Sequence, residues 1–166
     1  SRGLGDVYKR QDYYYTKDNK DKQIEVFERQ LDIAEKLNLP VVIHSRDAAG
    51  DTLEILKRHH NFGVIHSFSG SLEMAKEYIK LGFVLGVNGV VTFKNCNLGD
   101  TLKNIDINSI ILETDSPYLT PVPFRGIQNN PGKMINTAKF VADIYGVSLE
   151  ELAKITNQNI KRIFDI

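Results

Sequence analysis

Three side chains that can bind a metal ion follow short apolar runs in this sequence: His44, His66 and Asp115. Each lies where a run rich in Val, Ile and Leu meets a polar turn. A neutral imidazole binds zinc or manganese well, and a carboxylate binds most divalent cations. Parallel barrels build their active sites at the ends of such strands, so the arrangement predicts a divalent-metal hydrolase.

Each of these side chains also has a purely structural interpretation. A lone histidine after a strand, such as His44, is more often bonded to a backbone carbonyl in a core or turn. His66 repeats that placement one strand–helix unit later, and the repetition favours metal binding for both. Asp115 either caps the turn at Ser116 or binds a metal and takes a proton from the attacking water, as a catalytic base. Glu113 points to the same side of the strand, and we expect it to be a structural hydrogen-bonding group.

Three residues are candidates for substrate binding: Arg46, Ser69 and Arg125. The guanidinium groups of Arg46 and Arg125 match the geometry of a phosphate, and they lie beside a candidate ligand and in a long loop. The turn that contains Ser67, Ser69 and Gly70 offers hydroxyl and amide groups to an anion. Capping of the next helix is the alternative role for at least one of these serines.

Composition limits the class of protein. The 166 residues are 42% hydrophobic and 25% charged, which is typical of one globular domain. Basic and acidic residues number 21 each, so no broad electrostatic footprint for nucleic acid is indicated, although a local basic patch is compatible with this balance. Cys96 is the single cysteine, which favours a reducing compartment. No apolar run approaches the roughly 20 residues of a membrane span, so we expect a soluble, cytoplasmic protein without membrane contact.

The hydrophobic periodicity predicts helices and strands in alternation. Unbroken apolar runs predict short buried strands, at 41–43, 62–66, 83–87 and 110–115. Apolar residues at helical spacing predict helices over 20–38, around 53–56, after the Ser71 cap, over 98–105, over 134–145 up to Gly146, and after the capping box at Ser148. This order implies parallel strands with right-handed crossovers. The proline-rich loop 116–131 directly follows a strand, which is a common place for function.

The first eleven residues differ from the rest, because they show no clear periodicity. A fusion scar, a truncation junction or a sequencing artefact would all have this appearance. We therefore expect a foreign N-terminal segment over 1–11 and one partial hydrolase domain over 12–166.

Several ordered motifs resemble the TatD family of metal-dependent deoxyribonucleases, within the amidohydrolase-like barrels. The similar segments are Ile43-His44-Ser45-Arg46-Asp47-Ala48, His66-Ser67-Phe68-Ser69-Gly70-Ser71, Glu113-Thr114-Asp115-Ser116-Pro117-Tyr118-Leu119, Pro123-Phe124-Arg125-Gly126, Asn129-Asn130-Pro131, and Thr156, Asn157 and Asn159. The resemblance implies a (β/α)8 barrel with one or two divalent metal ions (Mg, Mn or Zn) and hydrolysis of phosphodiesters, typically at DNA ends. It places His44, His66 and Asp115 at metal-ligand positions, with Asp115 also activating the water.

The sequence departs from this family at its beginning. The family's His-x-His pair has no counterpart, and Tyr8 stands where the resemblance places a metal-bridging Glu. An eight-stranded barrel typically needs about 250 residues. We therefore expect an α/β fold that is the C-terminal half of a (β/α)8 barrel, with about four parallel strands and their helices.

The functional expectation is a metal-dependent deoxyribonuclease, acting as an exonuclease on DNA. A related barrel hydrolase that cuts a C–N or ester bond is the first alternative, because the same ligands serve both. A non-catalytic fragment is the second. A half-barrel would expose two sheet edges and an apolar face, which predicts little activity by itself and self-association.

Overall fold

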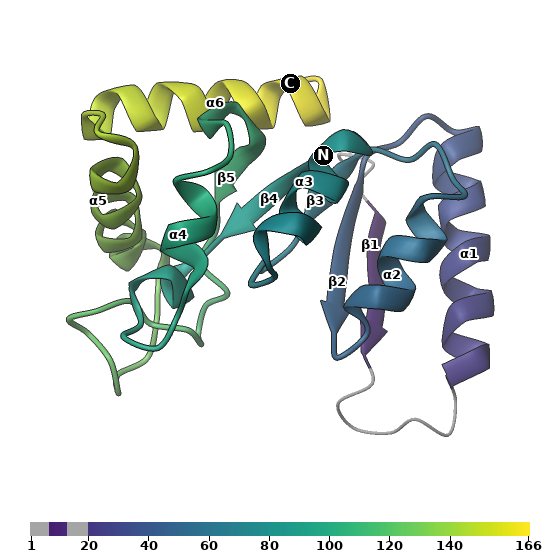
Figure 1. Ribbon diagram of the computed structural model, residues 1–166, viewed down its shortest axis with the longest axis horizontal. Coiled ribbons are helices and arrows are strands. Elements are labelled where there is room, and N and C mark those ends of the chain that lie inside the picture. Colours follow the sequence, from purple (N-terminus) through teal and green to yellow (C-terminus); the bar gives the residue numbers. More distant parts are fainter. Residues whose placement is uncertain (1–6, 13–19) are drawn as a thin grey trace.

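One parallel sheet organises the molecule. The computed structural model describes residues 7–12 and 20–166 (Figure 1). Within them, five strands lie side by side in chain order: β1 (Val7–Asp12), β2 (Val41–Arg46), β3 (Gly63–Ile65), β4 (Phe83–Val87) and β5 (Ile110–Leu112). All four strand pairs are parallel. The carboxyl ends of the strands therefore meet at one end of the sheet.

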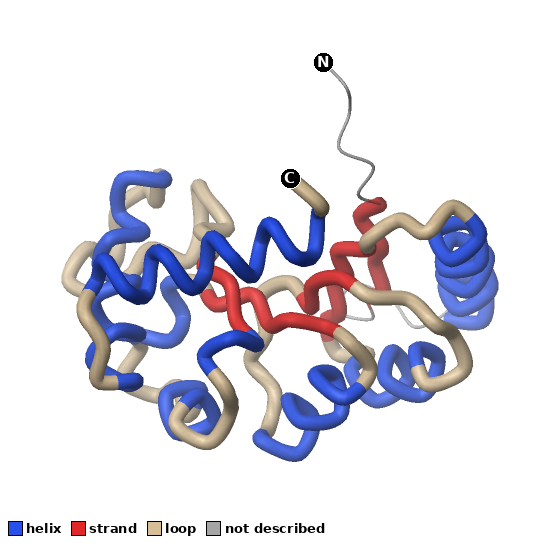
Figure 2. Tube along the Cα trace, turned by 90° about the horizontal axis from the view of Figure 1, so that it is seen from above, coloured by secondary structure: helices blue, strands red, loops and turns tan. Residues whose placement is uncertain are grey.

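Helices connect the strands and cover the sheet. They are α1 (Lys20–Lys36), α2 (Ala49–Leu56), α3 (Leu72–Lys80), α4 (Leu98–Leu102), α5 (Met134–Tyr145) and α6 (Leu149–Phe164), with short 3-10 turns η1 (Gly89–Thr92), η2 (Ile107–Ser109) and η3 (Pro131–Lys133). Figure 2 shows α6 on one side of the strands and several other helices along the opposite side. In Figure 1, α6 crosses the end of the molecule opposite to the one toward which β2 points.

The two faces of the sheet belong to two hydrophobic clusters. Side chains alternate between faces along a strand. Val41 and Ile43 of β2 contribute to the main core beneath α1 and α2, together with Ile65, Leu85 and Ile110 from the other strands. The opposite face carries a smaller cluster built by the amino-terminal part of the strands and the end of α6: Val64, Val84, Ile111 and Ile163.

The sequence predicted this architecture closely. The four predicted strands are present in order, and the caps of α3 and α6 form as expected, with Ser71 and Ser148 accepting backbone N–H groups. Gly146 ends α5 at a φ of 66°. Two strands are shorter than predicted. The strand predicted over 62–66 covers Gly63–Ile65. The strand predicted over 110–115 ends at Leu112, and Asp115 adopts a φ of 56°, outside the extended region.

The strand β1 has no counterpart in the sequence expectations. It covers Val7–Asp12, mostly within the segment expected to be foreign, and it pairs in register with β2 from Val7 opposite Val41 to Asp12 opposite Arg46. Residues 1–6 of that segment lie outside the described part of the chain. The division into a foreign segment over 1–11 and a hydrolase domain over 12–166 stays a prediction.

Among the helices of the described residues, none is both long enough and apolar enough to cross a bilayer.

Candidate metal and hydrolase site

A cleft of about 700 Å³ opens at the carboxyl ends of the strands. Its walls come from four chain segments that are far apart in sequence: the end of β2, the turn after β3, the turn after β4 and the loop after β5. The lining residues are His44, Ser45, Arg46, His66, Ser67, Val90, Asp115, Tyr118 and Leu119. The three predicted ligands therefore share one cleft, at the end of the sheet where parallel α/β folds place their sites.

His66 is the centre of the hydrogen-bond network in this cleft. Its backbone N–H donates to the carbonyl of Ile43 at 2.9 Å, which fixes the end of β3 against β2. Its Nδ1 lies 2.8 Å from Oε2 of Glu113, and its Nε2 lies 3.2 Å from Oδ1 of Asp115. A carboxylate only accepts hydrogen bonds, so Nδ1 carries a hydrogen and donates a hydrogen bond to Glu113. In the neutral ring, the lone pair of Nε2 then faces Asp115, whereas in the protonated ring Nε2–H donates to that carboxylate.

Glu113 holds the imidazole in this orientation. One carboxylate oxygen receives Nδ1–H of His66, and the other receives the backbone N–H of Ser67. This is the structural role expected for Glu113 from its position in the sequence. A carboxylate behind a ligating histidine fixes the tautomer and raises the basicity of the ligand nitrogen.

The surroundings of His66 change its proton affinity. Burial of the ring is the largest single influence and disfavours the protonated form. The hydrogen bond and charge of Glu113, with the charge of Asp115, together outweigh burial and raise the pKa of His66 above its ordinary value of 6.5. A bound cation would compete with this proton.

His44 lies on the adjacent strand, on the same side of the cleft. Its ring centroid is 5.9 Å from that of His66, with the two ring planes tilted by 32°. Arg46 is two residues further along β2, exposed at the rim of the same cleft. Ser45, between them, shares a 3.0 Å hydrogen bond with Thr52 of α2, which ties the strand end to the following helix.

Asn88 joins the network, although it was not singled out in the sequence. It is 2% exposed and follows β4 directly, as His66 follows β3. Its side-chain N–H donates to Oγ of Ser67 at 2.7 Å and makes a longer 3.5 Å contact with Oδ2 of Asp115, while its carbonyl oxygen caps η1. A polar residue at the end of a buried strand was the signal that identified His44 and His66, and the same signal applies to Asn88.

A second asparagine supports the loop after β5. Asn129 is 5% exposed and donates to the carbonyls of Thr114 and Tyr118 at 2.8 and 2.7 Å. Its own N–H donates to the carbonyl of Pro117. This asparagine therefore braces the part of the loop that forms one wall of the cleft.

Uncommon backbone conformations gather at this end of the sheet. Asp47, Ser67, Asp115 and Leu119 all have positive φ values between 51° and 56°. Such conformations are costly for residues other than glycine, and they tend to occur at functional sites, where the surrounding structure holds them in place.

Two of the predicted substrate-binding residues lie outside the cleft. Arg125 stacks on Phe93, with Cζ 3.7 Å from the ring centroid, and donates to the carbonyl of Thr120. Ser69 is exposed in the turn before α3, whose cap is Ser71. The structure thus brings His44, His66, Asp115 and Arg46 together and places Ser69 and Arg125 apart from them.

The donor types in the cleft fit a divalent cation, but the set is incomplete. Two imidazoles and one carboxylate suit zinc, manganese or a related ion. Yet within residues 7–12 and 20–166, no three His, Cys, Asp or Glu side chains are arranged as a group that could hold a metal. Asp115 and His66 touch each other, and His44 stands beside them. The described residues therefore bring the three candidate donors into one cleft without forming a complete metal site.

Known proteins with similar sequences and structures were found. The model of the family described as TatD related DNase matches residues 10–165. An uncharacterized metal-dependent hydrolase of Escherichia coli (strain K12), YcfH, is 42% identical over 159 residues, covering 93% of this chain and 60% of the relative. The uncharacterized metal-dependent hydrolase YabD of Bacillus subtilis (strain 168) is also 42% identical, covering 93% of this chain and 62% of its own length.

Solved structures show the same fold. The crystal structure of YjjV, a TatD homolog from Escherichia coli K12, superposes with a TM-score of 0.86 at 28% identity, over 98% of this chain and 63% of that one. A structure of an uncharacterized amidohydrolase from Saccharomyces cerevisiae gives a TM-score of 0.80 at 22% identity, which supports the fold alone. The chain thus spans about three fifths of the length of the relatives it resembles.

Proposed function

Because this chain belongs to the TatD related DNase family, we propose that it provides the metal-binding face of a divalent-metal hydrolase that cleaves phosphodiester bonds of DNA, acting as an exonuclease. The observation that carries this proposal is the convergence of His44, His66 and Asp115 in one cleft, with the His66 ring held by Glu113. The family supplies the expectation of DNA as the substrate.

In this proposal His44, His66 and Asp115 would hold the cation. When bound, Mg²⁺, Mn²⁺ or Zn²⁺ would lower the pKa of a water molecule and polarise a phosphoryl oxygen. The work of the residues is to keep the ligands oriented: Glu113 fixes the ring of His66, and Asn88 contacts the second oxygen of Asp115.

Asp115 is the proposed general base. Its carboxylate would take a proton from the attacking water, whose oxygen forms the new bond to phosphorus while the bond to the departing nucleoside oxygen breaks and that oxygen gains a proton. Arg46, at the rim of the same cleft, would neutralise charge on the phosphate. We place this activity in the cytoplasm, on the basis of the single cysteine.

We further propose that the chain by itself binds metal weakly and has little or no activity. The support is the incomplete ligand set of the described residues, together with relatives that are longer than this chain. Additional ligands would then come from a segment that completes the barrel.

Calorimetric titration of the purified chain with Mn²⁺ tests the metal assignment. We expect weak binding that Asp115→Asn reduces further, while Asp143→Asn, an exposed aspartate on α5, leaves it unchanged. Absence of any difference between the two variants would overturn the assignment of Asp115. Tight binding accompanied by degradation of a DNA oligonucleotide would contradict the incompleteness of the site.

A second assay distinguishes the proposed phosphodiesterase from the alternative hydrolase that cleaves a C–N or ester bond. Bis(p-nitrophenyl) phosphate reports phosphodiester cleavage, and p-nitrophenyl acetate reports ester cleavage, both with Mn²⁺ present. We expect that any activity that depends on Asp115 is seen with the phosphodiester and not with the acetate ester. Activity on the acetate that is lost in Asp115→Asn would favour the alternative hydrolase.

A further inference from the structure

Asn88 contacts the candidate site from the middle of the sheet. It follows β4, which lies between β3 and β5, and it is almost fully buried. The backbone just before it is bound to both neighbouring strand ends. The carbonyl of Gly86 accepts the N–H of Phe68 at 2.9 Å, and the carbonyl of Val87 accepts the N–H of Glu113 at 3.0 Å. The side chain of Asn88 therefore starts from a fixed point between the turns after β3 and β5.

Each polar atom of the Asn88 amide has its own partner. The backbone N–H of Val90 donates to the amide oxygen at 3.1 Å, so the NH2 group faces Ser67 and Asp115. This group donates to Oγ of Ser67 at 2.7 Å and lies 3.5 Å from Oδ2 of Asp115, which is long for a hydrogen bond. An asparagine suits this position because its amide supplies two donors and an acceptor, whereas aspartate has no donor and serine has one.

These contacts close a ring of five residues around the candidate ligands. Asn88 donates to the side chain of Ser67, whose backbone N–H donates to Glu113. Glu113 accepts Nδ1–H of His66, and Nε2 of His66 lies 3.2 Å from Oδ1 of Asp115. The second oxygen of Asp115 faces Asn88 again. The two oxygens of this carboxylate thus have different partners, which defines its orientation.

The same amide contacts two residues whose backbone conformations are costly. Ser67 has a φ of 51° and Asp115 a φ of 56°. Such conformations persist only where the surrounding structure holds them. Asn88 therefore contacts both of these turns at the side chains that line the cleft.

We propose that Asn88 is a positioning residue of the candidate site, which orients the carboxylate of Asp115 and couples it through Ser67 to Glu113. Its amide oxygen is engaged by Val90, so Asn88 acts through Asp115 and not as a ligand. The proposal rests on the proposed function for the role of Asp115 as ligand and base. The coupling between the two side chains needs no metal.

A purely structural role as the cap of η1 is the alternative. Asn88→Ser separates the two roles, because a serine hydroxyl also caps a helix but leaves Ser67 and Asp115 without the amide. We expect this variant to weaken Mn²⁺ binding about tenfold in a calorimetric titration. In an Asp115→Ala background the same exchange should have little further effect. Equal losses in both backgrounds would overturn the proposal.

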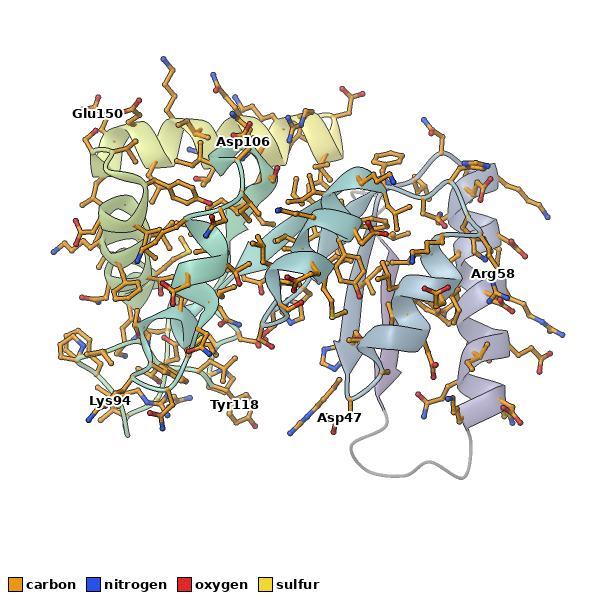
Figure 3. The ribbon with its side chains drawn as sticks, viewed as in Figure 1. Asp47, Arg58, Lys94, Asp106, Tyr118 and Glu150 are labelled. Carbon is orange, nitrogen blue, oxygen red and sulfur yellow. The ribbon has the colours of Figure 1, made fainter. Side chains whose placement is uncertain are left out.

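Asp106→Ser is the matched control. Asp106 caps η2 by accepting the N–H of Asn108, as Asn88 caps η1. Figure 3 shows Asp106 at the opposite end of the molecule from Tyr118 and Asp47. This exchange should leave Mn²⁺ binding unchanged. Weaker binding by the same factor in both cap variants would reduce Asn88 to a cap.

Urea denaturation without metal tests the coupling independently of the proposed function. The losses of stability in Asn88→Ser and Asp115→Ala should not add in the double variant, with a coupling of about fivefold in the unfolding equilibrium constant. Strictly additive losses overturn the proposal. Coupling in a chain that binds no Mn²⁺ would support the positioning of Asp115 and contradict the metal-hydrolase proposal, so the two failures are distinguishable.

Proton NMR of the Asn88 side-chain amide decides the question if Asn88→Ser does not fold. Asp115→Ala and Ser67→Ala each retain Asn88 and remove one of its two acceptors. Each variant should therefore shift a different one of the two Nδ2 proton signals. Signals that stay in place in both variants would show that Asn88 contacts neither side chain in solution.

Discussion

Glu113 lies against the bare Cα of Gly86, in a space that a side chain would fill. A methyl group added to Gly86 would stand 2.6 Å from Oε2 of Glu113, the oxygen that receives Nδ1–H of His66. Because Gly86 has no side chain, the carboxylate of Glu113 has room to lie against β4. From there it orients His66, the candidate ligand at the end of the neighbouring strand β3.

Replacing Gly86 by Ala should displace Glu113 and release the imidazole. We expect a loss of about 1 to 3 kcal/mol in the free energy of unfolding, from overpacking, and weaker Mn²⁺ binding by about tenfold or more, from loss of the oriented histidine. Urea denaturation and metal titration measure the two effects.

Gly50→Ala is the matched control for this substitution. Gly50 lies within α2 with nothing within 4 Å of an added methyl group, so alanine should stabilise the helix by about 0.5 to 1 kcal/mol. If Gly86→Ala left Mn²⁺ binding at the level of Gly50→Ala, the role assigned to Glu113 would be wrong.

Asn129→Ala should loosen the loop after β5. The variant loses three partly buried hydrogen bonds, two that Asn129 donates to the carbonyls of Thr114 and Tyr118 and one that it accepts from the backbone N–H of Asn130, and we expect a cost of about 2 to 3 kcal/mol. Amide hydrogen exchange in residues 116–128 should accelerate, whereas Asn157→Ala, on the exposed side of α6, should leave it unchanged. Uniform acceleration across the whole chain would instead indicate global destabilisation.

The raised pKa of His66 makes stability depend on pH in a defined direction. In the metal-free chain, the protonated ring gains stability from Glu113 and Asp115, and this contribution is complete below about pH 6.5 and is lost as the pH rises through the folded-state pKa. The free energy of unfolding should therefore decline over that interval. With saturating Mn²⁺ the direction should reverse, because the metal binds the neutral ring.

Glu113→Gln keeps the shape of the side chain and removes the charge that raises the pKa. In the metal-free variant, the free energy of unfolding should therefore decline less steeply as the pH rises. An unchanged slope would show that another group causes the pH dependence.

Self-association follows from the two edges of the sheet. Within the described residues, β1 pairs only with β2 and β5 only with β4, and an apolar hollow of about 440 Å³ adjoins β5 between α5 and α6. Open edges beside apolar surface promote pairing with another copy. Sedimentation velocity should detect species heavier than the 18.8 kDa monomer as concentration rises. Ile135→Glu, in the hollow, should reduce them, and Ile33→Glu, similarly exposed on α1, should not.

The positions of the candidate ligands at the strand ends could be predicted because two rules act locally. A buried strand needs an unbroken apolar run, and the first polar residue after it must lie at the end of the sheet, as His44 and His66 do. The contact of both Glu113 and Asp115 with one imidazole was beyond that reasoning, since β5 ends at Leu112 and the turn after it directs the two carboxylates.

The loop after β5 was predictable in position but not in shape. Its prolines indicated a stiff segment, yet they could not show that Arg125 would stack on Phe93, from the loop after a different strand. The segment Asn129-Asn130-Pro131 contributed to the family resemblance, but it did not indicate a structural role for Asn129, because an asparagine in a loop commonly serves a local turn. Its contacts with Thr114 and Tyr118 depend on how the loop folds back.

The end of α6 and the candidate ligands occupy opposite ends of the same face of the sheet. Ile163 closes the amino-terminal end against Val64, Val84 and Ile111, while the cleft opens at the other end. The residues that stabilise this end of the fold are therefore different from the residues that line the candidate site. Substitution of an exposed residue that lines the cleft, such as Tyr118, should therefore alter the cleft with little loss of stability, whereas substitution of Ile163 should lower stability and leave the cleft intact.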